Sequence, residues 1–386
     1  MNRYTTPSSD IPFIDAVWRQ ALPPSSAIEQ AAALALPVAA SRQAQDAIQR
    51  WEHYSPTPLH ALRGLANHFR LGAVYCKDEG QRLGLGSFKA LGGAYAVANL
   101  AQEKGTAITV TCATEGNHGR SVAWGAQRAG VPCVIFLHEG VSQAREEAIA
   151  RYGAQIRRVA GNYDDAVRTC AEVAEQEGWQ IVSDTTWEGY QEIPRQVMAG
   201  YSLIAKEVSG QIAQPPTHVF VQAGVGGIAA SLMASLQRAW PGAAMRFIVV
   251  EPRGAACILA SALAGGRLTA VSGPFDTISA GLACGEPSPA VLDLLMAGTS
   301  MFLALDDVWL KQAMRQYAQA IDNDASIVAG ASGAAGLAGL LAVLSEEQLS
   351  EALGLDAASR VLLINTENDT DPAAYQEIVT SQATDR

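Results

Sequence analysis

From about residue 108 onward, the sequence alternates short β-branched runs with segments of helical length. Glycines end two of these helical segments, at Gly130 and Gly153, and Asn162 with Asp165 has the spacing of a helix N-cap and its third helical residue. Strands separated by helices of this length are expected to pair in parallel, because each helix returns the chain to the start of the sheet. The predicted strands of this series are 108–112, 131–137, 155–159 and 181–183.

A second series of the same kind follows residue 215, with a predicted helix at 228–240. Its predicted strands are 217–222, 246–250 and 360–364. A chain of 386 residues is long enough for two domains. We therefore predict an α/β fold, built as two open parallel-sheet domains with helices on both faces of each sheet. Residues 1–50 are rich in Ala and are predicted to be helical, on the outside of the protein.

Composition and charge exclude several classes of partner. The formal net charge of -11 and an isoelectric point near 5.1 argue against a nucleic-acid partner or an anionic membrane surface. No stretch approaches the ~18 to 20 apolar residues of a membrane span, and the N-terminus lacks the pattern of a signal peptide, so we expect a cytoplasmic protein. The six Cys and six His residues are dispersed, which predicts buried thiols and gives no support to a metal site.

The segment 84–93 contains the first candidate for chemistry, Lys89, which small residues flank. An amine in a poorly solvated pocket has a lowered pKa, because burial disfavours its charged form. Schiff-base chemistry requires such an amine. Taken alone, however, a lysine on a solvated helix surface would give the same pattern.

The turn 114–120 is predicted to join a strand to a helix and includes Gly116, Asn117 and Gly119. Open α/β sheets bind ligands at the carboxyl ends of their strands, where this turn is expected to lie. The glycines permit close approach of the backbone, and the Asn117 amide can both donate and accept hydrogen bonds. An ordinary turn with Asn117 as a helix cap remains an equal alternative.

The loop 222–227 lies between a predicted strand and a predicted helix. Its backbone N–H groups and the helix N-terminus favour binding of a phosphate. The spacing Gly224-x-Gly226-x-x-Ala229 also fits a dinucleotide fingerprint, with Glu251 placed as the acidic ribose ligand, so a nicotinamide-dependent dehydrogenase is a competing interpretation. That interpretation leaves Lys89 and Asn117 without a role, and we favour a monophosphate.

The polar segment 365–371 directly follows the last predicted strand. Its side chains could meet the ring nitrogen of a cofactor, although a capped, solvated loop would also explain it.

Together these four segments resemble the fold type II family of pyridoxal-phosphate enzymes, which includes threonine dehydratase, threonine synthase and the tryptophan synthase β subunit. Members of that family carry an early lysine segment, an Asn-bearing turn, a Gly-rich phosphate loop and a C-terminal polar loop, in this order. Residues 54–59 also resemble the family's P-T-P-L motif. Within the family, the sequence from about residue 54 to 375 is similar to the diaminopropionate ammonia-lyases, and the matching blocks are 87–96, 116–120, 184–190, 222–226 and 281–287.

This resemblance implies the fold type II architecture, with a large cofactor-binding domain of residues 1–92 and 192–386 and a small α/β domain of residues 93–191. It implies pyridoxal 5'-phosphate as the cofactor, a small amino acid as the substrate and a homodimer as the assembly. The implied reaction is α,β-elimination of ammonia from 2,3-diaminopropionate, which yields pyruvate and ammonia.

The resemblance also implies roles for individual residues. Lys89 would bind the cofactor through its amine and later act as a base at Cα, and Asp184 would work near the substrate amines. Glu115 would be the base for the opposite enantiomer. The expected cofactor contacts are Asn117 at the ring hydroxyl, Gly224, Val225, Gly226 and Gly227 at the phosphate, and Asn365 or Thr366 at the ring nitrogen.

Four positions depart from the family pattern. Glu115 stands where Asp is usual, and Ala331 stands where many relatives have Glu. Asn365 replaces Ser, and Asn368 replaces Gly. Two alternatives therefore stay open: a dehydratase of serine, threonine or 3-hydroxyaspartate, and a catalytically inert pyridoxal-phosphate-binding relative.

Overall fold

The computed structural model describes residues 1–6, 12–114 and 116–381. Contacts divide the chain into two compact units, each built from separate stretches of sequence. Unit 1 comprises residues 1–37, 56–81 and 204–386, and unit 2 comprises residues 38–55 and 82–203. The domain limits inferred from the resemblance differ from these boundaries, because unit 2 also includes residues 38–55 and its longer stretch runs from 82 to 203 instead of 93 to 191. They stay a prediction.

Unit 1 contains an eight-stranded sheet in the order β1-β2-β11-β10-β9-β12-β4-β3. The central strands β11, β10, β9, β12 and β4 run parallel, while β1, β2 and β3 pair antiparallel at the two edges. The strands are β1 (Asn2–Thr5), β2 (Ile14–Trp18), β3 (Leu59–Ala61), β4 (Ala73–Asp78), β9 (His218–Gln222), β10 (Arg246–Pro252), β11 (Thr299–Leu305) and β12 (Arg360–Asn365).

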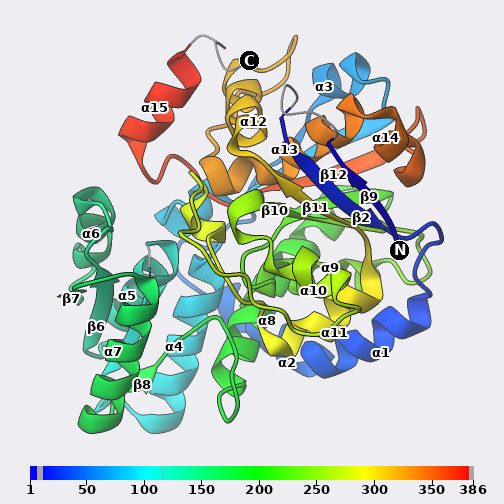
Figure 1. Cartoon of the computed structure of the whole chain (residues 1–386). Helices are drawn as coiled ribbons and strands as arrows, with labels where there is room; N and C mark the ends of the chain where they lie inside the picture. The colour runs from blue at the N-terminus through cyan, green and yellow to red at the C-terminus, as the bar shows by residue number, and fades with distance from the viewer. Residues whose placement is uncertain (7–11, 115, 382–386) are drawn as a thin grey trace. The chain divides into compact units, whose positions relative to one another are not determined.

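Helices cover both faces of this sheet, as the sequence predicts. α13 packs against β9, β10, β11 and β12, with α12 outside it, while α9 and α10 contact the sheet with α11 and α1 beyond them. In Figure 1, α12 and α13 lie above the strands and α9, α10 and α11 below. The helices of unit 1 are α1 (Ser25–Ala35), α3 (Arg63–His68), α9 (Gly227–Ala239), α10 (Cys257–Leu263), α11 (Pro289–Gly298), α12 (Asp307–Gln319), α13 (Ala331–Ser345), α14 (Glu347–Leu353) and α15 (Pro372–Thr380).

The N-terminal residues correct one prediction. Residues 1–50 do contain α1 and α2, but they begin with β1 and β2 instead of a helix. All five residues of β2 are buried, and β2 pairs with β11. Its sequence, IDAVW, is too short for its pattern to distinguish a strand from a helix. The neighbouring strand β11 determines the outcome, because it offers an unpaired edge.

Unit 2 contains a four-stranded, fully parallel sheet in the order β7-β6-β5-β8. Its strands are β5 (Val110–Ala113), β6 (Cys133–His138), β7 (Gln155–Val159) and β8 (Gln180–Ile181), which agree with the predicted strands to within two residues at most ends. Its helices are α2 (Val38–Ile48), α4 (Ala90–Lys104), α5 (Asn117–Ala129), α6 (Gln143–Ala150), α7 (Tyr163–Glu177) and α8 (Glu192–Gln211), which continues into unit 1.

Two features of unit 2 follow directly from local sequence. Asn162 and Asp165 form the predicted capping box at the start of α7, with Asp165 N donating to Asn162 Oδ1 at 3.1 Å. α4 and α5 lie close together, because Gly125 has no Cβ; a Cβ there would lie 2.6 Å from Ala94 Cα. This packing fixes the start of α4 relative to the start of α5.

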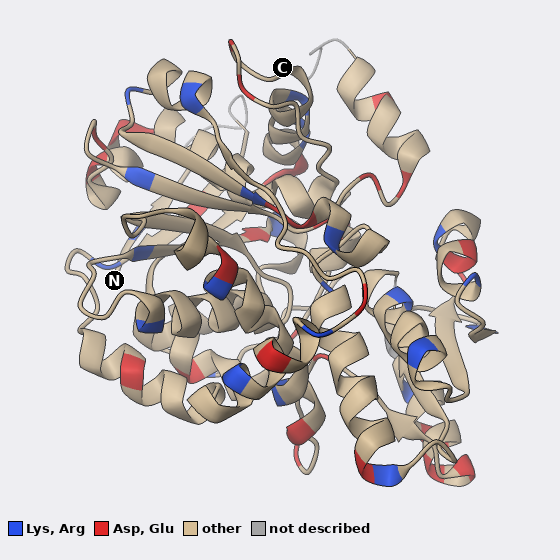
Figure 2. Ribbon diagram, turned by 180° about the vertical axis from the view of Figure 1, so that it is seen from behind, with Lys and Arg blue, Asp and Glu red and all other residues tan. Residues whose placement is uncertain are grey.

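Charge is dispersed over both units. Lys and Arg are spread among the elements of each unit instead of gathered on one of them, and Asp and Glu lie between them (Figure 2). Within the described part of the chain, every helix is too short or too polar to cross a membrane.

Candidate active site

Lys89 is the residue directly before α4, and the structure joins it to a predicted partner. The Lys89 ammonium forms an ion pair with the Asp184 carboxylate, which follows β8 in the same unit. The side chains of Lys89 and Asp184 are 19% and 20% exposed, so both are shielded but reachable. Ser121 Oγ on α5 donates to the Lys89 carbonyl at 2.6 Å, which holds the backbone of the lysine. Two residues that sequence analysis assigned separately thus form one polar pair.

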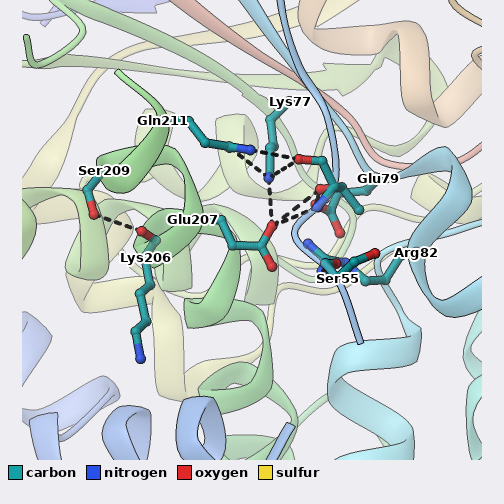
Figure 3. A network of polar contacts seen from close by, with 9 residues as sticks. Ser55, Lys77, Glu79, Arg82, Lys206, Glu207, Ser209 and Gln211 are labelled. Atoms are coloured by element: carbon teal, nitrogen blue, oxygen red, sulfur yellow. Dashed lines mark hydrogen bonds and ion pairs between the residues drawn. The ribbon is translucent and has the colours of Figure 1, made fainter. Parts of the chain in front are cut away.

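Three of the other four lysines are less suited to react. Lys77 on β4 is fully buried, and its ammonium donates to Thr57 O at 2.7 Å, Glu207 Oε2 at 2.6 Å and Gln211 Oε1 at 2.9 Å (Figure 3). An ammonium has three hydrogens, so these acceptors engage all of them. Lys104 and Lys206 are exposed. Lys89 therefore combines partial burial with access, as a reactive amine requires.

The charge of Asp184 is stabilised in this setting. Burial alone would raise the pKa of the Asp184 carboxyl, but the Lys89 charge, with a smaller effect from His118, holds it well below its ordinary range. Asp184 is consequently a carboxylate at neutral pH. A carboxylate beside an amine can hold a second ammonium group when the first loses its charge.

His118 and Tyr201 belong to this cluster, although sequence analysis gave neither a role. His118 Nδ1 lies 3.9 Å from Asp184 Oδ2, and burial lowers the pKa of the imidazole. The buried Tyr201 ring lies 4.7 Å from the ring of Phe88, and burial raises the pKa of its phenol above the ordinary range. His118 could have been found from its place in the 116–120 block. Tyr201 carries no local signal, because it is an ordinary buried position on α8.

The turn before α5 departs in part from its predicted role. Asn117 is the first residue of α5, and Arg120 Nη2 donates to its Oδ1 at 2.6 Å. Thr114 Oγ1 accepts from the backbone N–H groups of Gly116 and Gly119, both at 3.1 Å, so Thr114 caps this helix. The alternative that Asn117 is the cap is therefore wrong. The predicted base Glu115 lies outside the described residues.

In unit 1, the predicted phosphate loop lies where the sequence indicates. Gly224, Val225 and Gly226 connect β9 to α9, and Gly227 is the first residue of that helix. Gly226 has φ +96°, and a Cβ there would lie 2.8 Å from Leu295 Cδ1, so only glycine fits. The first N–H groups of a helix lack intrahelical acceptors, and at the start of the thirteen-residue α9 they form a site suited to an anion.

Glu251 argues against the dinucleotide alternative. Its carboxylate is 1% exposed and accepts hydrogen bonds from the backbone N–H groups of Ile258 and Leu259, both at 2.8 Å. It thus caps α10 from the end of β10, and burial raises its pKa to about 8. A buried acid that is already engaged cannot bind a ribose hydroxyl. The nicotinamide-dependent dehydrogenase interpretation loses its specific support.

The predicted ring-nitrogen candidates lie at the end of β12, beside the phosphate loop at the end of β9. Asn365 Nδ2 donates to Asp78 Oδ1 at 2.8 Å and to Val328 O at 3.0 Å, which uses both amide hydrogens. Thr366 Oγ1 accepts from Gln222 Nε2 at 2.8 Å. Because β9 and β12 are neighbours, the two predicted segments meet at the carboxyl edge of the sheet.

Three more buried polar residues surround this edge; Gln222 and Glu367 belong to the segments that the sequence singled out, but neither they nor Ser332 were given a role there. Gln222 Nε2 donates to Ser332 O at 2.7 Å, and Ser332 N donates to Glu367 Oε1 at 3.1 Å. All three side chains are less than 8% exposed. Their burial depends on how α13 approaches β12, which no local pattern encodes.

The chemistry of these groups fits a phosphate-bearing aldehyde. Unit 2 provides a primary amine beside a carboxylate, and unit 1 provides a glycine loop at a helix N-terminus with hydroxyl and amide groups nearby. Within the described ranges, no three His, Cys, Asp or Glu residues are grouped as a metal site would require.

Comparison with known proteins agrees with this chemistry. The family model for pyridoxal-phosphate dependent enzymes matches residues 50–367. Diaminopropionate ammonia-lyase from Escherichia coli K12 is 40% identical over 354 residues, which cover 86% of this chain and 89% of that enzyme. The enzyme of the same name from Salmonella typhimurium LT2 is 38% identical over 357 residues, 85% of this chain and 88% of that enzyme.

Solved structures give the same result. The Escherichia coli diaminopropionate ammonia lyase in complex with an aminoacrylate-PLP azomethine reaction intermediate matches with a TM-score of 0.85 and 38% identity, over 96% of this chain and 97% of that one. Its complex with D-serine matches with a TM-score of 0.86 and 37% identity, over 95% and 97% of the two chains.

Proposed function

The chain belongs to the pyridoxal-phosphate dependent enzyme family, and on this basis we propose that it eliminates ammonia from 2,3-diaminopropionate to give pyruvate and ammonia. The observation that carries the proposal is the Lys89–Asp184 pair, a shielded amine beside a stable carboxylate. The relatives of 38–40% identity that share nearly the full length support the choice of substrate.

The cofactor, when bound, supplies an electron sink for the bond that breaks at the substrate Cα. We propose that Lys89 binds the cofactor aldehyde through its amine and, once released, takes the Cα proton of one enantiomer. Partial burial favours this role, because a less hydrated amine loses its proton more easily. Glu115 is proposed as the base for the opposite enantiomer.

Each proposed cofactor contact follows the role that the family resemblance implies. The N–H groups of Gly224, Val225, Gly226 and Gly227 would hold the phosphate, and Asn117 would hold the ring hydroxyl. At the ring nitrogen, Asn365 or Thr366 is the proposed contact; the Asn365 amide donates to Asp78 and Val328 and the Thr366 hydroxyl donates to Ser332 O at 3.3 Å, so either residue would exchange a partner to bind the nitrogen. A neutral hydroxyl can donate to an unprotonated nitrogen but provides no charge to protonate it.

Ammonia leaves readily only as the protonated amine. Asp184 is therefore proposed to hold the β-ammonium group of the substrate near the place where the bond breaks. The Lys89 charge lowers the pKa of the Asp184 carboxyl, and a substrate ammonium in its place would stabilise the carboxylate in the same way. A carboxylate in this place also favours a diamino acid over a hydroxy amino acid, because only the diamino acid carries an ammonium group at Cβ.

The deciding experiment measures ammonia and pyruvate release from the D- and L-isomers of 2,3-diaminopropionate, after the absorbance spectrum of the purified protein has been recorded. We expect visible absorbance from bound cofactor and two molecules of ammonia for each pyruvate, because the β-amine leaves in the elimination and the α-amine is lost when the aminoacrylate product is hydrolysed. Serine, threonine and 3-hydroxyaspartate serve as comparison substrates.

Other outcomes would select the alternatives. Faster release from the hydroxy amino acids would identify a dehydratase, and L-threonine dehydratase from Escherichia coli, 30% identical over 56% of this chain, is a relative of that type. A coloured protein that is inert toward every β-substituted amino acid would identify a binding protein without catalysis.

We also propose that the protein works in the cytoplasm as a homodimer. The family resemblance supports the dimer. The cysteines support a reducing compartment, because all six are free thiols and only Cys284 is not buried.

A further inference from the structure

His118 is held in one orientation by a hydrogen bond that also determines its tautomer. Its Nε2 lies 2.8 Å from the Val182 carbonyl oxygen, which can only accept, so the imidazole carries a hydrogen on Nε2. The opposite ring nitrogen, Nδ1, is buried and has no hydrogen-bond partner among the residues that the structure describes. In the neutral ring, Nδ1 presents a lone pair.

That lone pair faces the Asp184 carboxylate, with Nδ1 3.9 Å from Oδ2. The same oxygen binds the Lys89 ammonium. The carboxylate therefore has two basic neighbours, one on α5 and one before α4. Among the described residues, the other titratable groups around this pair are the buried Tyr201 and Cys112 and the half-buried Tyr190, and burial raises the pKa of all three above the ordinary range.

We propose that His118 is a positioning residue that takes up a proton on Nδ1 when Lys89 loses its charge, so that Asp184 always has one cationic neighbour. While Lys89 is an ammonium, a second positive charge on His118 is unfavourable. When the lysine amine is neutral, a proton from solvent binds Nδ1 and forms a charged hydrogen bond to Asp184 in place of the lost ion pair.

The proposal predicts reciprocal coupling between two titrations. Removing the Lys89 charge makes His118 easier to protonate, and thermodynamic linkage requires that the effect be mutual. In the wild-type protein, burial lowers the pKa of His118, the Asp184 carboxylate raises it, and the Lys89 charge lowers it, with a net pKa below the ordinary value. Without the Lys89 charge, the remaining partner is an anion, and we expect the titration midpoint of His118 to rise by roughly one to two pH units.

The test is NMR of histidine labelled with ¹³C in the full-length protein, with six His residues to assign. The His118 midpoint is compared between wild type, Lys89→Met and Lys89→Arg, all without bound cofactor, so that Lys89 of the wild type carries its ammonium beside Asp184. Lys89→Met keeps the length of the side chain and removes its charge, whereas Lys89→Arg keeps the charge. We expect the rise in Lys89→Met alone.

His218 is a matched internal control. It is also buried, its Nε2 also bonds a backbone carbonyl, that of Leu353 at 2.9 Å, and burial also lowers its pKa. It belongs to unit 1, however, and in the part of the chain that the structure describes no carboxylate forms an ion pair with its ring, although the more distant Asp356 raises its pKa. Its midpoint should be unchanged in Lys89→Met.

Two results would overturn the proposal. One is a His118 midpoint that stays within a few tenths of a pH unit in Lys89→Met, and the other is an equal rise at His218. If Lys89→Met fails to fold, Asp184→Asn gives the opposite test, because loss of the anion should lower the His118 midpoint. The proposal depends on the proposed function only for its catalytic meaning; the NMR result is independent of turnover, so the two can fail separately.

Discussion

At the scale of single residues, Lys89 is distinguished by its partner and not by its burial alone. Lys77 is fully buried and its ammonium donates to three acceptors, whereas Lys89 is partly exposed and its ammonium forms an ion pair with the Asp184 carboxylate. The cofactor lysine must release one bond to form another. This difference in hydrogen bonding is what the sequence around either lysine could not show.

Replacing Lys89 by Ala is expected to abolish both the visible absorbance of bound cofactor and the release of ammonia, because the amine that binds the cofactor is lost. Absorbance spectra and a coupled ammonia assay measure the two effects. Lys104→Ala is the control, since Lys104 belongs to the same unit but is exposed and bonds only the Gln180 side chain at 2.8 Å. Full ammonia release by the Lys89 variant would show that another group carries the cofactor.

Replacing Glu115 by Gln is expected to lower turnover of one enantiomer of diaminopropionate by about 10²- to 10⁴-fold and to leave the other nearly unchanged. The reason is that a proton base acts on one face of the substrate only, and an amide cannot accept the proton. Steady-state assays with each pure isomer give the two rates. An equal loss for both isomers would remove the assigned role.

At the scale of elements, buried polar groups decide how several segments meet. Lys77 on β4 binds Glu207 and Gln211 on α8, while the Thr57 hydroxyl before β3 donates to Glu79 at 2.6 Å (Figure 3). A buried ion pair of this kind adds little net stability by itself, but the loss of one partner leaves a buried charge uncompensated. The network thus determines the arrangement of β4, α8 and the segment before β3.

Lys77→Met should therefore reduce the free energy of unfolding by about 3 to 5 kcal/mol, because Glu207 would keep its charge in a dry environment. Lys104→Met, on the surface, should change it by no more than about 0.5 kcal/mol. Urea denaturation of both variants measures the difference. Similar small changes for the two variants would mean that water or a proton compensates Glu207.

The cap of α10 makes stability depend on pH. Glu251 has a folded pKa of about 8, above its ordinary value, because it is buried. The folded protein therefore binds a proton more tightly than the unfolded chain, so this contribution is complete below pH 4 and is lost as the pH rises through about 8. Glu251→Gln resembles the protonated acid and is expected to lack this loss.

Thermal unfolding between pH 6 and 9 tests this expectation. The melting temperature of Glu251→Gln minus that of the wild type should increase as the pH rises. A difference that stays constant across this range would show that Glu251 does not titrate there.

At the scale of the whole molecule, each unit places its polar groups where its sheet and helices begin and end. The carboxyl ends of β9 and β12 hold the phosphate loop and the Thr366 hydroxyl, and the segments around β5 and β8 hold His118 and Asp184. In both units, therefore, the candidate functional groups lie near the carboxyl ends of parallel strands, where open α/β sheets bind ligands.

The proposed homodimer should have a mass of about 81 kDa, twice 40.6 kDa. Size-exclusion chromatography with light scattering at micromolar concentration measures it. A mass near 41 kDa over the whole concentration range would exclude the dimer, while leaving the assignment of the cofactor site untouched.

The sequence by itself determined those features that arise from neighbouring residues. The parallel strands, the capping box at Asn162, the glycine loop before α9 and the candidate Lys89 all follow from periodicity, turn chemistry and local motifs. Such features depend on interactions within about one or two helical turns, and these can be recognised from the order of residues alone.

Tertiary structure alone decided the pairings between distant residues. It joined Lys89 to Asp184, which is 95 positions away, turned His118 toward the same carboxylate, inserted β2 beside β11, and used Glu251 as a cap instead of a ribose ligand. In each case, the partner residue comes from another element of the fold. The burial of a polar group determines whether it can bind a ligand or bonds only to its neighbours in the protein. That burial depends on how the elements pack, which no local sequence pattern contains.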